Sequence, residues 1–206
     1  MLQPLTESAF AEKTNVSRET LSRFRSYADL LVRWQASINL VSENTLKDIW
    51  RRHFWDSVQL ARFIPKRPCV ITDLGSGAGF PGLVLSIFLD IEVNLVDSSG
   101  KKVAFLREAA RVTDANIVLH QGRIEDLVLP KSDLITARAL APLEKLVDLA
   151  MPVLSPGGKC LFLKGARAEE ELTNAKKEWK MTVRRFPSAT NANGVILSIQ
   201  DIARDG

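Results

Sequence analysis

Cysteine is scarce in this sequence, and its scarcity argues against several kinds of chemistry. The 206 residues include two cysteines and two histidines. Cys69 and Cys160 each fall in an apolar run, and neither belongs to a Cys-x-x-Cys pair. Metal sites and redox centres need such pairs or clusters of ligands. We therefore expect no metal and no redox centre, and a reducing cytoplasm is the simplest location.

Long apolar runs are missing as well. No window approaches the roughly eighteen uninterrupted apolar residues that a membrane-spanning helix needs. The first residues, Met1 to Glu7, lack the basic start and apolar core of a signal peptide. The sequence thus predicts a cytoplasmic protein with no membrane partner, and we expect a monomer.

The chain has no strong excess of one charge. Its formal net charge is +4 and its pI about 9.2, which is compatible with nucleic acid but does not require it. Basic pairs such as Lys101-Lys102 and Arg184-Arg185 recur at the ends of expected elements, where a phosphate backbone can touch several together. Solvated helix faces explain the same pattern equally well.

The first part of the chain reads as helical. Ser17 is a suitable N-cap, and the residues after it form a stripe at helical spacing. The stripe consists of Leu21, Phe24, Leu31, Trp34 and Ile38, widened by Tyr27 and Leu30. A second helix is expected from Thr45 to Ile64, with a break along its length. We predict that residues 1–66 form a helical extension packed on the rest.

From Cys69 onward, strand-like and helix-like segments alternate. Such alternation predicts an α/β fold with a parallel sheet and right-handed crossovers. The expected strands are 69–74, 92–97, 116–121, 133–138, 159–164, 181–186 and 194–200, and the helices are 82–90, 100–113, 143–154 and 168–179. A turn is expected at 155–158. The short link between the last two strands indicates an antiparallel hairpin. Residues 67–206 should therefore form a Rossmann-like domain with a seven-stranded, mostly parallel sheet and an antiparallel edge.

A glycine-rich turn follows the first expected strand. Gly75, Gly77 and Gly79 alternate between Asp73 and Phe80, and the missing β-carbons allow a ligand to lie directly against the backbone. Asp97 ends the second expected strand twenty residues after Gly77. An acid at this place suits the two hydroxyls of a ribose. The pattern therefore predicts a site for an adenosine-containing cofactor.

The spacing of the glycines distinguishes between cofactors. Dinucleotide sites favour G-x-G-x-x-G, whereas here an acid, Asp73, stands two residues before an alternating glycine run. A carboxylate repels phosphates but suits the cationic amino-acid tail of S-adenosylmethionine. S-adenosylmethionine is thus the expected cofactor. A dinucleotide, or a tight turn that binds nothing, is the alternative.

Other chemically active side chains stand at the ends of later strands. In open α/β sheets, ligands collect beyond the carboxyl ends of the strands. Ile124 and Glu125 are placed to hold the adenine, although Glu125 can also be an ordinary exposed acid. Arg138 and Lys164 end the fourth and fifth strands and are candidates for contacts to the cofactor, a base or a phosphate. A structural ion pair is the competing role of each.

One further pair lies in the helical part of the chain. His53 and Asp56 are one helical turn apart, with Arg52 beside them. A His–Asp pair suggests general-base catalysis, but a capping or interdomain hydrogen bond explains it as well.

The sequence also lacks the motifs of several methyl-transfer reactions. It has no Asn-Pro-Pro-Tyr or Asp-Pro-Pro-Tyr segment for exocyclic amines and no C-x-x-x-C-x-x-C radical cluster. Its one Pro-Cys pair, Pro68-Cys69, stands where the first expected strand begins, away from the carboxyl ends of the strands at which ligands collect. An acceptor with its own lone pair, such as guanine N7, is then the simplest. Catalysis would then consist of placing the acceptor in line with the sulfonium methyl group of the cofactor.

These residues together resemble one family. The sequence is similar to the RsmG (glucose-inhibited division protein B) family of bacterial 16S rRNA guanine-N7 methyltransferases over nearly its whole length. The similar segments are Asp73 to Gly82, Lys101-Lys102, Phe105-Leu106, Arg123-x-Glu125, Arg138-Ala-Leu, Leu163-Lys164-Gly165, Trp34-x-x-x-Ile38-Asn39-Leu40 and Arg52-His53-x-x-Asp56-Ser57. Gln35 departs from the family pattern, which usually has Asn there.

The resemblance implies a Rossmann-like class I S-adenosylmethionine-dependent methyltransferase that acts on guanine N7 in the 530-loop region of 16S rRNA, in the 30S subunit or its precursor. The implied cofactor contacts are Gly75, Phe80, Ile124, Glu125 and Arg138, to which the residue pattern adds Asp73, Gly77, Gly79 and Asp97. The candidate catalytic residues are Arg138, Arg123, Lys164 and His53. The alternatives are a methyltransferase of a small molecule or protein and a non-catalytic ribosome assembly factor that binds the cofactor or RNA.

Overall fold

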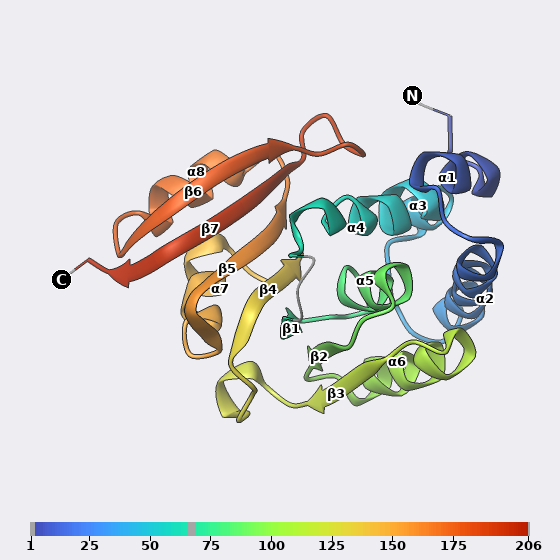
Figure 1. The fold of residues 1–206 in the computed structure, drawn as a ribbon, viewed down its shortest axis with the longest axis horizontal. Helices are drawn as coiled ribbons and strands as arrows, with labels where there is room; N and C mark the ends of the chain where they lie inside the picture. The colour runs from blue at the N-terminus through green and yellow to red at the C-terminus, as the bar shows by residue number, and fades with distance from the viewer. Residues whose placement is uncertain (1–2, 66–68, 206) are drawn as a thin grey trace.

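The computed structural model describes residues 3–65 and 69–205 and centres on one β-sheet (Figure 1). The strands are β1 Ile71–Leu74, β2 Val93–Asp97, β3 Ile117–Gln121, β4 Ser132–Arg138, β5 Leu154–Lys164, β6 Trp179–Pro187 and β7 Val195–Arg204. They lie in the order β3-β2-β1-β4-β5-β7-β6. Strands β1 to β5 are parallel, and β7 runs antiparallel to β5 and β6. The predicted seven-stranded sheet with an antiparallel hairpin at one edge is confirmed.

The strand order reverses between β1 and β4. From β1 the chain moves outward to β2 and β3, then returns to place β4 on the other side of β1. Where the order reverses, the connections leave on opposite faces and open a crevice at the carboxyl ends of the strands. The glycine turn after β1 and the residues after β4 therefore border the same crevice.

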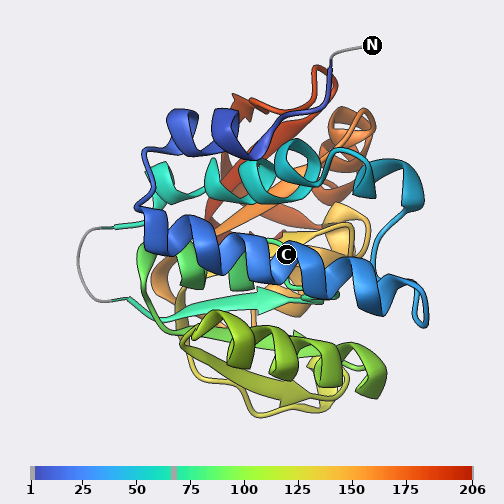
Figure 2. The same ribbon diagram turned by 90° about the vertical axis from the view of Figure 1, so that its right-hand side faces the viewer.

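Helices cover both faces of the sheet (Figures 1 and 2). Helices α5 Gly82–Leu89 and α6 Gly100–Thr113 pack on the face that the N-terminal helices also cover. The opposite face is covered by α7 Leu143–Ala150 and α8 Ala168–Ala175. Helix α6 begins at the N-cap Ser99, whose hydroxyl accepts a hydrogen bond from the backbone N–H of Lys102. No helix in the described ranges is long and apolar enough to cross a membrane.

The N-terminal helices form an arm laid across α5 and α6. Helices α1 Glu7–Thr14 and α2 Arg18–Gln35 are regular, and the predicted N-cap Ser17 is confirmed by a 3.0 Å bond from the N–H of Thr20 to its hydroxyl. The second predicted helix is divided into short pieces. These pieces are α3 Glu43–Leu46, a π-helical segment Trp50–Trp55, α4 Asp56–Val58 and a 3₁₀ turn Ala61–Phe63. π-Helical turns often occur at functional sites, and this one contains Arg52 and His53.

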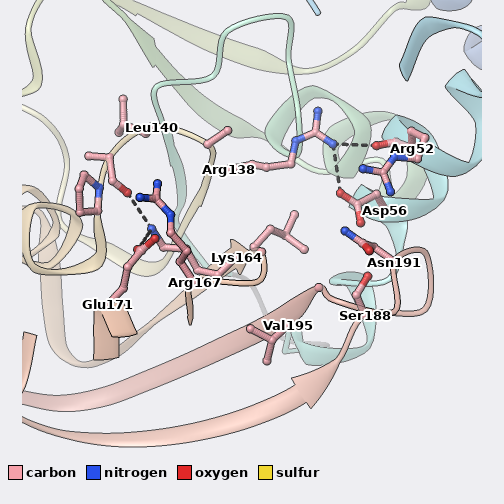
Figure 3. A pocket seen from close by; sticks show the side chains of 16 residues that line it. Arg52, Asp56, Arg138, Leu140, Lys164, Arg167, Glu171, Ser188, Asn191 and Val195 are labelled. Carbon is pink, nitrogen blue, oxygen red and sulfur yellow. Dashed lines mark hydrogen bonds and ion pairs between the residues drawn. The ribbon is translucent and has the colours of Figure 1, made fainter. Parts of the chain in front are cut away.

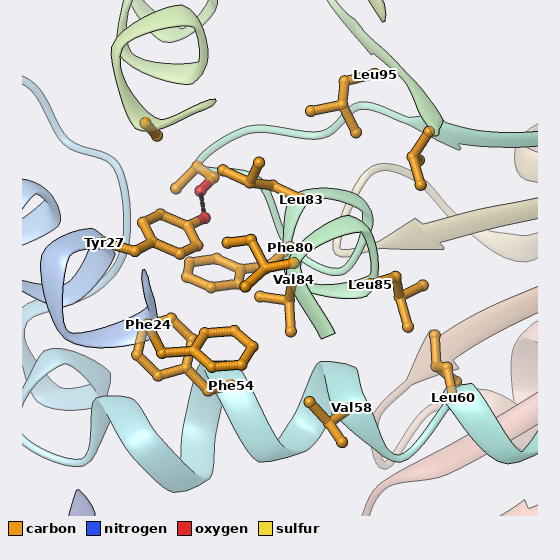
Figure 4. Packing of buried hydrophobic residues seen from close by; sticks show 14 of the residues in the cluster. Phe24, Tyr27, Phe54, Val58, Leu60, Phe80, Leu83, Val84, Leu85 and Leu95 are labelled. Atoms are coloured by element: carbon orange, nitrogen blue, oxygen red, sulfur yellow. Dashed lines mark hydrogen bonds between the residues drawn. The ribbon is translucent and has the colours of Figure 1, made fainter. Parts of the chain in front are cut away.

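Aromatic packing joins the arm to the sheet domain (Figure 4). Phe24, Tyr27 and Phe54 from the arm are fully buried. The Tyr27 ring stacks on Phe80, which follows the glycine turn, with 5.5 Å between ring centroids. Burying each such ring contributes about 1.5–3 kcal/mol, so arm and sheet share one hydrophobic core. The predicted boundary between residues 66 and 67 lies outside the described residues.

Strand β5 begins earlier than predicted. The Pro-Gly-Gly sequence at 156–158 predicts a turn before a strand at 159, but the strand starts at Leu154. The pairing with β4 shifts register between Ser132 and Leu134, and Gly157 has a φ of 74°. Residues 155–158 therefore form an irregularity within the strand and not a turn before it.

Candidate active site

Three cavities adjoin one another at the carboxyl ends of the strands. The glycine-turn cavity has a volume of about 360 Å³ and is bordered by Gly75 to Ala78, Phe80, Thr45 and His53. The Asp97 cavity, about 440 Å³, is bordered by Asp97, Gly122 to Glu125 and Lys145. The hairpin cavity, about 430 Å³, lies between Arg138, Lys164 and the loop joining β6 to β7 (Figure 3). Ala139 borders all three.

The glycine turn and Asp97 are in direct contact. The backbone N–H of Gly77 donates a hydrogen bond to one carboxylate oxygen of Asp97 at 2.8 Å, and the N–H of Ser99 donates to the other at 2.8 Å. Gly77 has a φ of 58°, and a β-carbon there would stand in ordinary contact with the carbonyl oxygen of Gly75. The left-handed backbone therefore favours glycine at this position. A carboxylate offers about four lone-pair positions, which leaves two of Asp97 free for further donors. The two predicted strand tips therefore form one site.

Asp73 does not face this site. It is fully buried, and its carboxylate accepts hydrogen bonds from the Thr136 hydroxyl at 2.7 Å and from the N–H of Gly82 at 3.2 Å. Burial raises its pKa to about 6, although these bonds act in the opposite direction. Asp73 borders none of the three cavities. The geometry thus corrects its predicted contact with the cofactor tail: Asp73 instead ties β1 to β4 and to the start of α5.

Gly79 also has a different role from the predicted one. A β-carbon there would collide with the Tyr27 hydroxyl and the side chain of Leu83. The Tyr27 hydroxyl donates a hydrogen bond to the carbonyl of Ala78. Gly79 therefore permits close approach of α2 to the turn, and it borders none of the three cavities. Tyr27 was missed as a site residue, although it is the only tyrosine of the chain and lies on the apolar stripe.

The Asp97 cavity contains the residues predicted to hold adenine. Ile124 is half-buried at its wall. The carboxylate of Glu125 lies 3.4 Å from the Lys145 ammonium and 3.7 Å from the Arg123 guanidinium. The side chain of Arg123 is 73% exposed and stands at the rim, away from the hairpin cavity. Nothing in the geometry gives Arg123 a catalytic position.

Arg138 is held by three groups of the arm. Its guanidinium donates hydrogen bonds to the carbonyl of Arg52 at 3.0 Å, the carboxylate of Asp56 at 3.1 Å and Nδ1 of His53 at 2.8 Å. It also lies over the Phe80 ring, 4.8 Å from its centroid. The structural ion pair that the sequence left open for Arg138 is thus formed with Asp56. Arg138 remains at the wall of two cavities, but its charge is already paired.

His53 is fixed as a neutral acceptor. Its Nδ1 accepts from Arg138, and its Nε2 lies 2.9 Å from the Thr45 hydroxyl, which itself donates to the carbonyl of Ser42. Nε2 must then carry the proton. Burial, followed by the charges of Arg138 and Arg52, lowers the pKa of His53 to about 3. His53 and Asp56 do not bond to each other as the sequence suggested; both bind Arg138, and His53 has no lone pair free to act as a base.

We expect the stability of the protein to fall as the pH falls below about 6.5, because His53 takes a proton in the unfolded chain before it does so in the folded one. The folded pKa of about 3 lies below the ordinary value of 6.5, so the unfolded state binds more protons in between. The free energy of unfolding should drop by about 2 kcal/mol from pH 7.5 to 5 on this account. Urea unfolding at several pH values in this range measures the change, with His53→Asn as the comparison. The free energy of unfolding of the variant should depend less steeply on pH than that of the wild type. Equal pH dependence of the two proteins would contradict the prediction.

Lys164 is paired as well. Its side chain is 8% exposed, and the ammonium lies 2.6 Å from the carboxylate of Glu171 and 2.7 Å from the carbonyl of Ala141. Glu171 in turn accepts from the N–H of Leu143 at the start of α7. Lys164 thus fixes the segment between β4 and α7. Of the two roles that the sequence leaves open for Lys164, the geometry shows the structural ion pair.

Gln35 stabilises a loop that borders the glycine-turn cavity. Its side-chain carbonyl accepts from the N–H groups of Leu40 and Val41, and its amide donates to the carbonyl of Val41. Leu40 and Val41 both line this cavity. Gln35, where the sequence departs from the family pattern, therefore fixes this loop through three hydrogen bonds. An asparagine side chain is one methylene shorter and would not place its amide at the same position.

Comparison with known proteins places this chain in a family. A family model described as rRNA small subunit methyltransferase G matches residues 20–195. The chain belongs to this family. The chain is 52% identical over 192 residues to the ribosomal RNA small subunit methyltransferase G of Paramagnetospirillum magneticum, covering 93% of this chain and 94% of that one. It is 50% identical to the protein of the same name from Rhodospirillum centenum, covering 96% and 91%. The predicted family is confirmed.

More distant solved structures share the fold of this family member. A ribosomal protein L11 methylase from Lactobacillus delbrueckii superposes with a TM-score of 0.58 at 18% identity, covering 74% of this chain and 77% of that one. The glycopeptide N-methyltransferase MtfA, complexed with S-adenosyl-L-methionine, gives 0.57 at 13% identity, covering 72% and 94%. At such low identity these likenesses show the fold alone. The predicted Rossmann-like class I methyltransferase fold is confirmed.

Proposed function

We propose that this protein is an S-adenosylmethionine-dependent methyltransferase that transfers a methyl group to guanine N7 in the 530-loop region of 16S rRNA. The contact between Gly77 and Asp97 is the observation that supports it most. It joins the glycine turn after β1, one of the two strands between which the order reverses, to a carboxylate at the end of β2. The contact lies beside a cavity large enough for a nucleoside. Membership of the family supports small-subunit rRNA as the substrate.

The residues of the site fit S-adenosylmethionine. The free lone pairs of Asp97 suit the ribose hydroxyls, and the half-buried Ile124 offers an apolar wall to the adenine. The glycine-turn cavity continues from there, with Gly75 and Lys102 bordering both cavities. Its glycine backbone and the Lys102 ammonium suit the amino-acid tail with its carboxylate.

S-adenosylmethionine, when bound, supplies an electrophilic methyl group on its sulfonium. The acceptor base is expected in the hairpin cavity, because that cavity shares Arg138 and Ala139 with the glycine-turn cavity. The chain's own contribution is then to orient the base and exclude water.

Guanine N7 is favoured because the site offers no free base. His53 is neutral, and both its ring nitrogens are engaged. Asp56 and Glu171, the two carboxylates lining the hairpin cavity, are each paired with a cation. An acceptor that must first lose a proton therefore has no partner here, whereas N7 carries its own lone pair.

Cleavage of 16S rRNA at N7-methylguanine tests this proposal. rRNA from a strain lacking the gene is compared with rRNA from the same strain carrying the wild-type gene or an Asp97→Ala variant, after borohydride and aniline treatment. We expect a cut in the 530-loop region with the wild-type gene alone. Identical patterns in all three would exclude guanine N7, and labelling of a protein or small molecule by radioactive S-adenosylmethionine would indicate another acceptor.

A further inference from the structure

The walls of the hairpin cavity contain two basic side chains more than acidic ones. Its walls contain four basic side chains, those of Arg52, Arg138, Lys164 and Arg167, and two acidic ones, those of Asp56 and Glu171. Arg138 is paired with Asp56 at 3.1 Å, and Lys164 with Glu171 at 2.6 Å. The cavity therefore keeps an excess of two positive charges.

These two charges belong to Arg52 and Arg167. Within residues 3–65 and 69–205, neither guanidinium makes an ion pair or a hydrogen bond; Arg52 bonds through its backbone alone, with its N–H donating to Asp48 and its carbonyl accepting from Arg138. Arg167 is exposed and Arg52 partly so. A guanidinium presents a planar fork of donors that matches a phosphate. Both side chains are thus available to an anion from solution without breaking a bond in the protein.

The two arginines approach the cavity from different elements. Arg52 comes from the π-helical segment of the arm and stands beside Asp56, whereas Arg167 precedes α8 and stands near Lys164 and Glu171 (Figure 3). A strand of nucleic acid that places one base in the cavity has a phosphate on each side of that nucleotide, which matches two separate cations.

We propose that Arg52 and Arg167 each bind a backbone phosphate of the RNA, one on either side of the target nucleotide. Arg138 and Lys164 then position the walls of the cavity and do not supply these contacts. This inference rests on the proposed function for its substrate, an unpaired stretch of rRNA. Beyond that function, it identifies the two residues that bind the RNA backbone.

Binding of a labelled 16S rRNA transcript to the full chain at several KCl concentrations tests the inference. The variants are Arg52→Gln, Arg167→Gln and the pair together, and Arg18→Gln is the matched control. Arg18 is exposed at the start of α2, makes no ion pair in the described part of the chain and lines none of the three cavities. S-adenosylmethionine affinity is measured on each variant by calorimetry.

Each single variant should bind the transcript roughly tenfold more weakly, the size expected for one lost charge-assisted hydrogen-bond pair. The pair together should lose roughly a hundredfold. The slope of log affinity against log salt should become shallower by about 0.7 for each arginine removed. Arg18→Gln should match the wild type, and Arg52→Lys should recover part of the loss. S-adenosylmethionine affinity should stay unchanged in Arg167→Gln, because Arg167 borders the hairpin cavity and neither of the other two. Arg52 also borders the glycine-turn cavity, so the cofactor affinity of Arg52→Gln distinguishes a phosphate contact, which leaves that affinity unchanged, from a contact to the cofactor.

Transcript affinity equal to that of Arg18→Gln would overturn the inference, because the phosphates would then contact other residues. A loss of S-adenosylmethionine affinity in Arg52→Gln would overturn it for Arg52, which would instead bind the cofactor carboxylate. The binding assay requires no methyl transfer. A failure of guanine-N7 methylation in the cleavage experiment therefore leaves the comparison of variants interpretable, and the two failures are distinguishable.

Discussion

Replacing Asp97 with alanine is expected to weaken S-adenosylmethionine binding by roughly a hundredfold or more. The carboxylate offers its free lone pairs to two ribose hydroxyls, and each hydrogen bond to a charged group is worth about 1.5–3 kcal/mol. The substitution also removes the acceptor of the N–H groups of Gly77 and Ser99. The turn would then lose the contact that fixes it to β2. Isothermal titration of the cofactor into the wild type and the variant measures the change.

Asp126→Ala is the matched control for this measurement. Asp126 is an exposed acid in the short turn after β3, and it borders none of the three cavities at the strand ends. Its removal changes the net charge by the same amount, so it should leave the affinity within about twofold. Equal affinity of Asp97→Ala and Asp126→Ala would show that the nucleoside does not lie against Asp97.

The positions of the strand ends are predictable from the sequence because they depend on local patterns. An apolar run followed by a glycine turn or an acid fixes where a strand stops. Parallel strands then bring those ends to one edge of the sheet. Gly77, Asp97 and Ile124 are found together for this reason. The contact between Gly77 and Asp97 itself follows from the pairing of β1 with β2.

The direction in which a side chain points is less predictable. All four residues of β1 are buried, so no alternation of polar and apolar residues reveals which face Asp73 occupies. Asp73 lies on the face covered by α5, where the N–H of Gly82 is available. From the sequence alone, the carboxylate of Asp73 can bind a ligand or the first N–H groups of a helix. Which of the two it does depends on the face of the sheet toward which its side chain points.

Pairings between distant residues are also invisible in the sequence. Arg138 and Lys164 stand at strand ends like ligand-binding residues, but their partners come from other elements. Asp56 lies 82 residues before Arg138 in the chain. It directly follows the π-helical segment Trp50–Trp55, which stands where a regular helix is expected. A pattern of helical spacing contains no signal for such a segment.

Removing the guanidinium of Arg138 is expected to have the second large effect. In Arg138→Met, the carboxylate of Asp56, Nδ1 of His53 and the carbonyl of Arg52 lose their common donor. Breaking one side of a largely buried ion pair costs about 3 kcal/mol, so the free energy of unfolding should fall by about that amount. Urea unfolding measures it. Methyl transfer should fall as well, because the arm and the end of β4 border the same two cavities.

Two further measurements separate this role from a general loss of packing. The charge of Arg138 lowers the pKa of His53, so an NMR titration of Arg138→Met should show that pKa raised. In a double-mutant cycle with Asp56→Ala, removal of both partners should lower the free energy of unfolding by less than the sum of the single losses, since neither charge is then left unpaired.

Arg111→Met provides the comparison. The Arg111 side chain is 70% exposed in its ion pair with Glu108, so its replacement should lower the free energy of unfolding by less than about 0.5 kcal/mol. A strictly additive cycle, or an unchanged pKa of His53, would mean that Arg138 does not link the arm to the strand end, and the arm would then be held to this edge of the sheet by its aromatic packing alone.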